Sequence, residues 1–439
     1  MMKKIITCLC ALIVTSTFSQ TFNTKRLDSL FALLEKNNKF MGSIAIAENG
    51  KTIYTKSIGF DDIASSKKSS INTKYRIGSI SKTFTASLIF KAVEEKKIDL
   101  NQTIDKYFPT IKNAKTITIS NLLNHRSGIY DFTSNPDYLK WNTQPQSRAK
   151  MTERIAAGDV VFEPNTKGKY SNSNYILLSY ILEDIYKKSY GEILNLKIIK
   201  PLKLKNTYLG GKINLENNEA YSYTLSGKWE KETETDMSIP LGAGAIVSNP
   251  TDLNQFIEGL FAGKIVSIEH LNEMKTIKDK YGMGIMELPY FERKSYGHNG
   301  AIDGFRSLLD YFPEEKLALA ITSNGAMGYD NNSVLLCALS SYFNKPFTMP
   351  VFTSITVTAE TLDPYLGTYG SAQIPLKIDI TKKDNILVAQ ATGQPSFPLE
   401  ATAANIFKFD AAGIILEFNP DKKEMILKQG GKEFTFNKQ

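Results

Sequence analysis

The segment Ser79-Ile80-Ser81-Lys82 places a hydroxyl and an amine three residues apart at the start of a helical pattern. Residues i and i+3 share one face of a helix, so the Lys82 amine can reach the Ser79 hydroxyl. A serine is a weak nucleophile unless a neighbouring group takes its proton. The free N–H groups and the positive dipole end of a helix N-terminus also suit a developing oxyanion. The segment therefore predicts a helix that carries a nucleophile, its base and part of an oxyanion hole.

The same four-residue pattern occurs twice more, at Ser65-x-x-Lys68 and Ser147-x-x-Lys150. Both lie in polar, loop-like sequence without a following apolar period, so we expect both on the solvated surface. The pattern alone does not identify a site, and the choice depends on the rest of the chain.

The first three quarters of the chain mix helical periods with alternating strands. A helical period covers 27–34, and two alternating runs at 43–47 and 52–55 flank an Asn-Gly pair, which is typical of a hairpin. Further helices are expected at 79–93 and 175–186, and 117–125 predicts a short extended piece followed by a helix. Another helix opens at 251–256, with Thr251 or Asp252 near its cap. Adjacent antiparallel strands are expected at 306–312 and 317–321. These elements predict an α+β, three-layer fold of helices around an antiparallel sheet.

Composition changes near residue 345, and helical periods fade after about residue 360. We expect a hydrolase-sized domain at 20–345, a linker at 346–358 and a small all-β domain at 359–439. Turn residues in this last part separate short strand candidates, which favours an antiparallel barrel or sandwich. The candidates are 377–380, 385–388, 406–409, 414–418, 425–427 and 433–436.

Residues 1–19 read as a cleavable secretory signal peptide, with Lys3 and Lys4 before a short apolar run. We therefore expect an exported protein, periplasmic or secreted. Lipid attachment at Cys10 is disfavoured, because only a few apolar residues precede it. Cleavage would leave Cys337 as the one cysteine, in an apolar run that indicates a buried thiol. No later segment approaches the eighteen apolar residues of a membrane span.

The chain has 53 basic and 45 acidic side chains with no long basic block, so nucleic acid is not an expected partner. Metal-binding spacings, phosphate loops and dinucleotide fingerprints are absent from the sequence, and we predict no metal or cofactor. A Gly-x-Ser-x-Gly elbow is also absent, which disfavours an α/β-hydrolase. The oligomeric state is left open.

Two further motifs follow Ser79 in order. Tyr170-Ser171-Asn172 offers a phenol that can transfer protons and an amide that can hold a substrate. His298-Asn299-Gly300 offers a glycine that lets backbone approach a ligand closely, as on a strand lining a site. Taken singly, a tyrosine or histidine of this kind is more often structural.

As an ordered set, the three motifs closely resemble the serine β-lactamase and D-alanyl-D-alanine peptidase superfamily. The resemblance covers about residues 25–345 and is strongest to the class C β-lactamase, DD-carboxypeptidase and esterase branch. The C-terminal strands resemble, more weakly, a β-rich domain often appended to such hydrolases.

The resemblance implies a role for each matching residue. Ser79 would be the acylated nucleophile, with Lys82 and Tyr170 exchanging its proton. Asn172, His298, Asn299 and Gly300 would bind substrate, and the backbone N–H groups of Ser79 and Ala301 would form the oxyanion hole. His125 also matches a family motif, and we expect it to be structural, beneath the site.

One motif departs from the family pattern. Class C β-lactamases usually carry Lys-Thr-Gly where this chain has His298-Asn299-Gly300. His-x-Gly resembles DD-peptidases, D-aminopeptidases and some esterases, which makes β-lactam breakdown the less expected activity. Asn299 stands where a Thr or Ser hydroxyl often fixes a substrate carboxylate, which favours esters or amides that lack one.

The sequence therefore predicts an exported serine hydrolase acting through an acyl-enzyme, DD-carboxypeptidase-like or peptidase-like on D-amino-acid peptides of the peptidoglycan type. Its partner would be a small peptide or ester substrate, including cell-wall peptide. The alternatives are a carboxylesterase or D-aminopeptidase or amidase on the same scaffold, a class C-like β-lactamase, and a non-catalytic penicillin-binding-like module.

Overall fold

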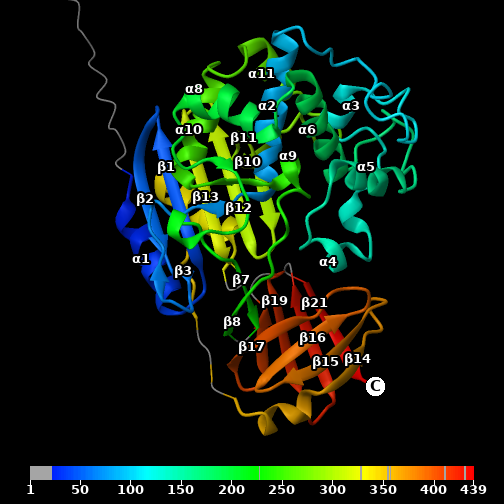
Figure 1. Ribbon diagram of the computed structural model, residues 1–439. Helices are drawn as coiled ribbons and strands as arrows, with labels where there is room; N and C mark the ends of the chain where they lie inside the picture. Colours follow the sequence, from blue (N-terminus) through cyan, green and yellow to red (C-terminus); the bar gives the residue numbers. More distant parts are fainter. Residues whose placement is uncertain are drawn as a thin grey trace, which may run out of the picture.

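The computed structural model describes residues 22–439 apart from positions 227, 327–328, 353–354, 356, 410–411 and 430–431. The predicted signal peptide therefore lies outside the described residues. Figure 1 shows a larger helix-and-sheet region joined to a smaller β structure that contains the C-terminus. Within the described part of the chain, no helix is long and apolar enough to cross a bilayer.

An antiparallel six-stranded sheet forms the centre of the larger region, in the order β10-β11-β12-β13-β1-β2. The predicted hairpin is confirmed, since β1 pairs with β2, and the expected β12–β13 pair is also confirmed. The strand bounds are β1 Met41–Glu48, β2 Lys51–Ile58, β10 Met286–Tyr290, β11 Arg293–Ile302, β12 Phe305–Phe312 and β13 Leu317–Gly325.

Alternate side chains of a strand point to opposite faces of the sheet, and helices cover both of these faces. Ala318 and Ala320 of β13 belong to the core under the larger helical layer, whereas Leu317 and Leu319 pack on the opposite side. The second layer consists of α1 (Thr24–Lys36) and α12 (Asn331–Tyr342). The predicted three-layer α+β fold is confirmed (Figure 1).

The larger helical layer also carries the segments that surround the catalytic candidates. Its helices are α2 Ser81–Glu94, α3 Ile119–Leu123, α4 Tyr138–Trp141, α5 Arg148–Ala156, α6 Asn172–Tyr186, α7 Tyr190–Leu194, α8 Lys200–Leu202, α9 Leu241–Gly244, α10 Pro250–Phe261 and α11 Ile268–Met274. The short helical turns are η1 Gly78–Ile80, η2 Phe132–Ser134, η3 Asn195–Ile199 and η4 Leu215–Asn217. Small peripheral sheets pair β3 Phe60–Asp62 with β4 Lys67–Lys68, β9 Ile246–Ser248 with β5 Tyr75–Arg76 and β6 Tyr208–Leu209, and β7 Tyr223–Ser226 with β8 Lys228–Lys231.

The helix expected to open at 251–256 is confirmed, with Thr251 and Asp252 in the first turn of α10. Its cap is Asn249, whose side chain accepts from the Asp252 backbone N–H at 3.0 Å. One local expectation was wrong: Ser147 does not lie in a loop but caps α5, whose buried Met151 and Ile155 form a weak apolar period. Ser147 and Lys150 are nevertheless exposed, as are Ser65 and Lys68.

The C-terminal strands close into an eight-stranded barrel, because β14 pairs with both β15 and β21. The predicted small antiparallel β domain is confirmed as a barrel rather than a sandwich, filled by side chains such as Phe407 and Phe436. It follows η5 (Glu360–Tyr365). The strands are β14 Gly367–Gly370, β15 Lys377–Lys383, β16 Ile386–Ala391, β17 Phe397–Ala403, β18 Ile406–Phe409, β19 Ile414–Asn419, β20 Glu424–Gln429 and β21 Lys432–Lys438.

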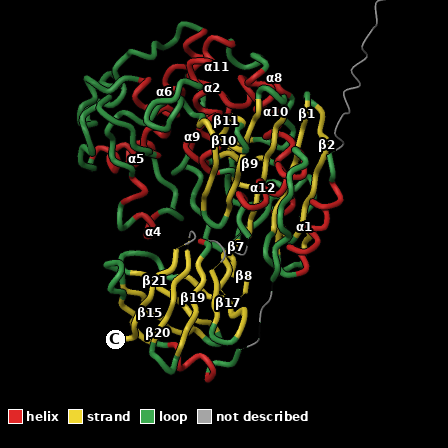
Figure 2. Tube along the Cα trace, turned by 180° about the vertical axis from the view of Figure 1, so that it is seen from behind, coloured by secondary structure: helices red, strands yellow, loops and turns green. Residues whose placement is uncertain are grey.

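The barrel lies against the larger region through β17, which contacts β7. Figures 1 and 2 both show the β7–β8 hairpin between the main sheet and the barrel. Glu400 of β17 also forms an ion pair with the buried Lys39. The barrel is therefore joined to the larger region by side chains as well as by the connecting chain.

A buried carboxyl group inside the sheet makes stability depend on pH. Asp310 of β12 is fully buried, accepts from the Ser295 hydroxyl at 3.1 Å, and has no partner for Oδ2 among the described residues. Burial raises the pKa of Asp310 from 3.8 to about 7. The folded chain thus keeps a proton that the unfolded chain loses above pH 4. Unfolding free energy should fall as pH rises from about 4 to 7.

Replacing this group tests the effect. Asp310→Asn removes the ionisation, and we expect it to raise the unfolding free energy at pH 8 by on the order of 2–4 kcal/mol. The gain should shrink towards pH 4, where the wild-type carboxyl is protonated. Urea unfolding from pH 4 to 8 measures this, with the exposed Asp137→Asn as control. A gain that did not change with pH would contradict the assignment.

Candidate active site

Ser79 and Lys82 lie at the junction of η1 and α2, so the predicted helical start is confirmed. The Lys82 Nζ is 3.0 Å from Ser79 Oγ. It also donates to Asn172 Oδ1 at 2.8 Å and to the Ala243 carbonyl oxygen at 2.7 Å. These contacts aim the amine at the serine, and the helical spacing brings the two side chains together as expected.

The surroundings of Lys82 favour its neutral form. Its side chain is fully buried, and burial lowers its pKa from 10.5 to about 7, although the Asp131 charge opposes the shift. A lysine with such a pKa is partly unprotonated near neutral pH and can accept a proton from a hydroxyl. The electrostatics therefore suit Lys82 as a base.

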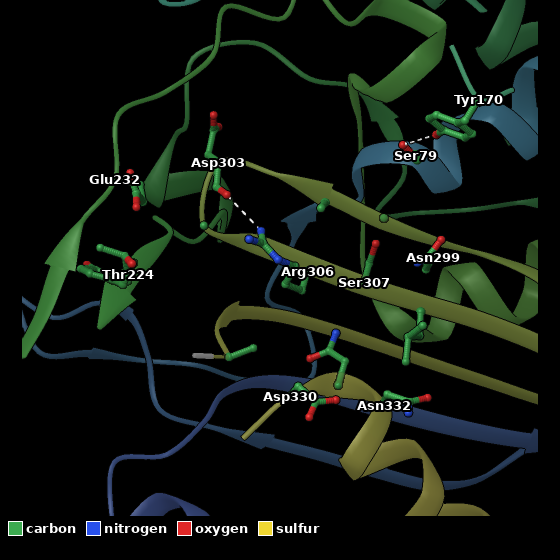
Figure 3. Close-up of a pocket in the computed structure, with 17 residues that line it drawn as sticks. Ser79, Tyr170, Thr224, Glu232, Asn299, Asp303, Arg306, Ser307, Asp330 and Asn332 are labelled. Atoms are coloured by element: carbon green, nitrogen blue, oxygen red, sulfur yellow. Dashed lines mark hydrogen bonds between the residues drawn. The ribbon is translucent and has the colours of Figure 1, made fainter. Parts of the chain in front are cut away.

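Tyr170 reaches the same oxygen from the other side. Its hydroxyl donates to Ser79 Oγ at 2.8 Å (Figure 3), and its ring centroid lies 4.9 Å from Lys82 Nζ. Burial raises the pKa of Tyr170 well above its usual value. The phenol is therefore a proton donor in this state.

Asn172 connects the lysine to an acid that sequence reasoning missed. Its Nδ2 donates to Asp131 Oδ2 at 3.0 Å, which turns its Oδ1 towards Lys82. Asp131 itself accepts from the Thr133 backbone N–H as the cap of η2. Asp131 belongs to no motif with Tyr170 or Lys82, and only the folded chain reveals the contact.

The His298-Asn299-Gly300 motif lies on β11, next to η1. The buried His298 ring faces Tyr170 with a centroid separation of 6.3 Å. Its Nδ1–H donates to the Asn299 carbonyl oxygen at 2.5 Å, which leaves Nε2 as an acceptor. Burial and the nearby Lys82 lower the pKa of His298 to about 4. A neutral imidazole thus stands where the related pattern has a lysine.

Glycines at two positions allow β11 to approach the nucleophile. A Cβ on Gly78, which has φ +50°, would lie 2.8 Å from the Ala301 nitrogen. A Cβ on Gly300 would lie 2.1 Å from the Ile77 carbonyl oxygen. Both contacts are too short for a side chain, so the backbones of η1 and β11 meet beside Ser79. This close approach brings the Ala301 N–H next to the serine, as an oxyanion hole needs.

His125 packs beneath Tyr170, with ring centroids 4.4 Å apart, and accepts from the Ser171 backbone N–H at 3.2 Å. Burial lowers its pKa well below the usual value. Tyr281 packs against both rings, at 5.1 Å from His125 and 6.2 Å from Tyr170, and was also missed. These contacts fix the Tyr170 ring and suit His125 as a structural residue.

Two cavities meet at Ser79, Glu232, Ala301 and Asp303. The larger has a volume of about 590 Å³ and is lined by Tyr170, whereas the smaller, of about 430 Å³, is lined by Asn172. Asn299, Gly300 and Ala301 line the larger one, so the predicted β11 residues do reach a cavity at the serine. No cluster of three or more metal-binding side chains occurs in the described ranges.

A family model described as Beta-lactamase matches residues 30–333. The chain belongs to the Beta-lactamase family. The predicted superfamily is thereby confirmed, with its mixture of helices and antiparallel sheet.

Several members and structural neighbours resemble this Beta-lactamase-family protein. The teichoic acid D-alanine hydrolase of Staphylococcus aureus (strain MRSA252) is 30% identical over 347 residues, covering 76% of this chain and 82% of the relative. The D-amino acid amidase of Ochrobactrum anthropi SV3, complexed with L-phenylalanine, is 26% identical with a TM-score of 0.65, covering 73% of this chain and 99% of the amidase. The octameric penicillin-binding protein homologue of Pyrococcus abyssi shares the fold over 94% of this chain and 99% of its own, at 24% identity and a TM-score of 0.66.

Proposed function

We propose that this protein is a serine hydrolase that forms an acyl-enzyme on Ser79 and cleaves D-aminoacyl esters or amides. The observation that carries the proposal is the pair of contacts to Ser79 Oγ, from Lys82 Nζ at 3.0 Å and from the Tyr170 hydroxyl at 2.8 Å. A nucleophile held between a base and an acid is the arrangement that acyl transfer needs.

The geometry supports a separate role for each of these residues in acylation. Neutral Lys82 takes the Ser79 proton as Oγ attacks the carbonyl carbon, and the Ser79 and Ala301 N–H groups stabilise the oxyanion. Tyr170 donates its proton to the leaving oxygen or nitrogen as the bond to carbon breaks, and Lys82 returns a proton to Tyr170. Water then attacks the ester on Ser79, with the same groups reversing their roles. The neutral His298 supplies no cation to stabilise a Tyr170 phenolate, which favours Lys82 as the base.

The substrate class rests on the relatives. The names of a teichoic acid D-alanine hydrolase and of a D-amino acid amidase both point to substrates that contain a D-amino acid. The DD-carboxypeptidase-like activity predicted from the sequence belongs to the same class, because it also transfers an acyl group that ends in D-alanine. Export follows from the sequence of residues 1–19 and stays a prediction.

A substrate panel tests the proposal. We expect the purified protein to hydrolyse D-alanine methyl ester or D-alaninamide at least about tenfold faster than the L-isomers, with slow turnover of a cephalosporin. D-alanyl-D-alanine peptides in the same panel measure the carboxypeptidase-like activity. Equal rates on D- and L-substrates would overturn the substrate class. Cephalosporin turnover typical of a dedicated β-lactamase would favour the β-lactamase alternative, and an adduct without turnover the penicillin-binding-like module.

A further inference from the structure

The smaller of the two cavities at Ser79 lies on the acyl side of the cleaved bond. In the acylation described above, Tyr170 gives its proton to the leaving group, so the leaving group lies in the larger cavity, which Tyr170 lines. The smaller cavity is lined instead by Asn172, Ala243 and Gly244. The acyl group of the substrate therefore extends into the smaller cavity.

This cavity offers more room than the methyl side chain of alanine requires. Its volume of about 430 Å³ lies within the range of sites that bind small-molecule ligands. An alanyl group bound to Ser79 would leave much of that space to water. A branched or aromatic side chain would fill more of it.

Apolar side chains form one wall of the cavity. They are Phe132, Tyr138, Leu139, Pro240 and Ile302. The rings of Phe132 in η2 and Tyr138 in α4 pack edge to face, with centroids 5.8 Å apart, and Trp141 contacts both rings. Aromatic pairs of this kind prefer a defined geometry, so these contacts fix the position of the wall.

Hydrogen bonds also tie α4 to the segment that follows β8. The Asp236 backbone N–H donates to the Asn142 carbonyl oxygen at 2.8 Å. Asn142 Nδ2 donates to Thr235 Oγ1 at 3.2 Å, and both of these residues line the cavity. Figures 1 and 2 show α4 at the end of the helical layer that is nearest the barrel. The apolar wall is therefore held in place from two sides.

Leu139 is the exposed part of this wall. Its side chain is 77% exposed, whereas Phe132 is 2% exposed. Removing an exposed leucine side chain from water is favourable, and an apolar group in the cavity would cover it. Leu139 is thus available to contact a substrate.

The acidic side chains of the cavity are compatible with an apolar occupant. Asp303 accepts from Arg76 Nη1 at 2.8 Å and from Thr235 Oγ1 at 2.6 Å, so protein groups already balance its charge. Glu232 adds a negative charge to the lining. That charge disfavours an anionic acyl side chain and attracts the α-ammonium group of an aminoacyl substrate.

We propose that the smaller cavity is the side-chain pocket for the acyl group, that it prefers a branched or aromatic apolar D-side chain to the methyl group of D-alanine, and that Leu139 contacts this side chain. The inference rests on the proposed function and adds the class of acyl side chain to it.

Matched methyl esters of D-alanine, D-leucine and D-phenylalanine test the proposal, because all three have the same leaving group. For wild type we expect kcat/KM to be at least about tenfold higher on the D-leucine and D-phenylalanine esters than on the D-alanine ester, since each added methylene favours binding in an apolar pocket. Leu139→Ser should lower kcat/KM about fivefold on the two larger esters and change it less than about twofold on the D-alanine ester.

Two further full-length variants serve as comparisons. Leu139→Met keeps an apolar side chain and should retain the preference for the larger esters. Val351→Ser removes a similarly exposed apolar side chain, 79% exposed and outside the cavity lining, and should behave as wild type.

The outcomes separate this inference from the proposed function. If wild type cleaves the three D-esters equally well, or prefers the D-alanine ester, only this inference fails. Equal losses on all three esters in Leu139→Ser, or the same loss in Val351→Ser, would overturn the role of Leu139. If wild type cleaves none of the D-esters, the proposed function fails and this inference fails with it.

Discussion

Replacing Ser79 by alanine is expected to lower kcat/KM on a D-alanyl ester by about 10⁴-fold or more, because the Ser79 hydroxyl is the proposed nucleophile of the acyl-enzyme. The effect should be chemical rather than structural. Ser79 is only half-buried, and loss of its hydroxyl leaves Lys82 hydrogen-bonded to Asn172 and to the Ala243 carbonyl oxygen. Unfolding temperatures of variant and wild type should therefore be similar.

Intact mass spectrometry checks the same variant directly. Wild-type protein quenched in acid during turnover, or incubated with a penicillin, should gain the mass of one acyl group, and Ser79→Ala should gain none. The two other Ser-x-x-Lys matches provide the controls. Ser65→Ala and Ser147→Ala should keep full activity, although loss of the Ser147 cap of α5 should cost about 1 kcal/mol of stability. An adduct that persisted in Ser79→Ala would refute the nucleophile assignment.

Replacing Lys82 by arginine is expected to lower kcat/KM by about 10³-fold, within the usual range for a general base. Arginine keeps the positive charge but cannot lose its proton near neutral pH. Because burial lowers the pKa of Lys82 to about 7, wild-type kcat/KM should rise with pH and level off above about pH 7. In the variant, this rise should disappear from the residual activity.

A lysine on the same helix serves as the control. Lys91 lies on α2 and pairs with Glu94 near the surface, so Lys91→Arg should retain the wild-type rate and pH profile. A wild-type profile that was flat from pH 6 to 9 would contradict the assignment of Lys82 as the base. A profile that fell with increasing pH would instead point to an essential protonated group.

Much of the fold was predictable, because local patterns report which side chains must be buried. The β1–β2 hairpin follows from alternation around Asn49-Gly50, and α6 follows from an apolar helical period. Elements with weak periods were missed. Strand β14 contains Gly367 and Gly370, and β17 contains Pro398; both residue types are poor strand signals, yet barrel closure pairs these strands with their neighbours.

The sequence alone determined the candidates of the site and their order: Ser79, Lys82, Tyr170 and His298. Spacing within one helix sufficed for the first two, because i and i+3 always share a face. The tertiary structure decided how these groups are charged. Burial lowers the pKa of Lys82 and of His298 and raises that of Tyr170, and burial is a property of the packed chain.

Contacts between distant segments also required the fold. Asp131 reaches Asn172 from another element, and Leu139 lines the cavity at Ser79 only because the fold places α4 there. The Ser79-x-x-Lys82 segment differs from the two exposed matches for the same reason. Its lysine is buried against α6 and α9, whereas Lys68 and Lys150 are exposed.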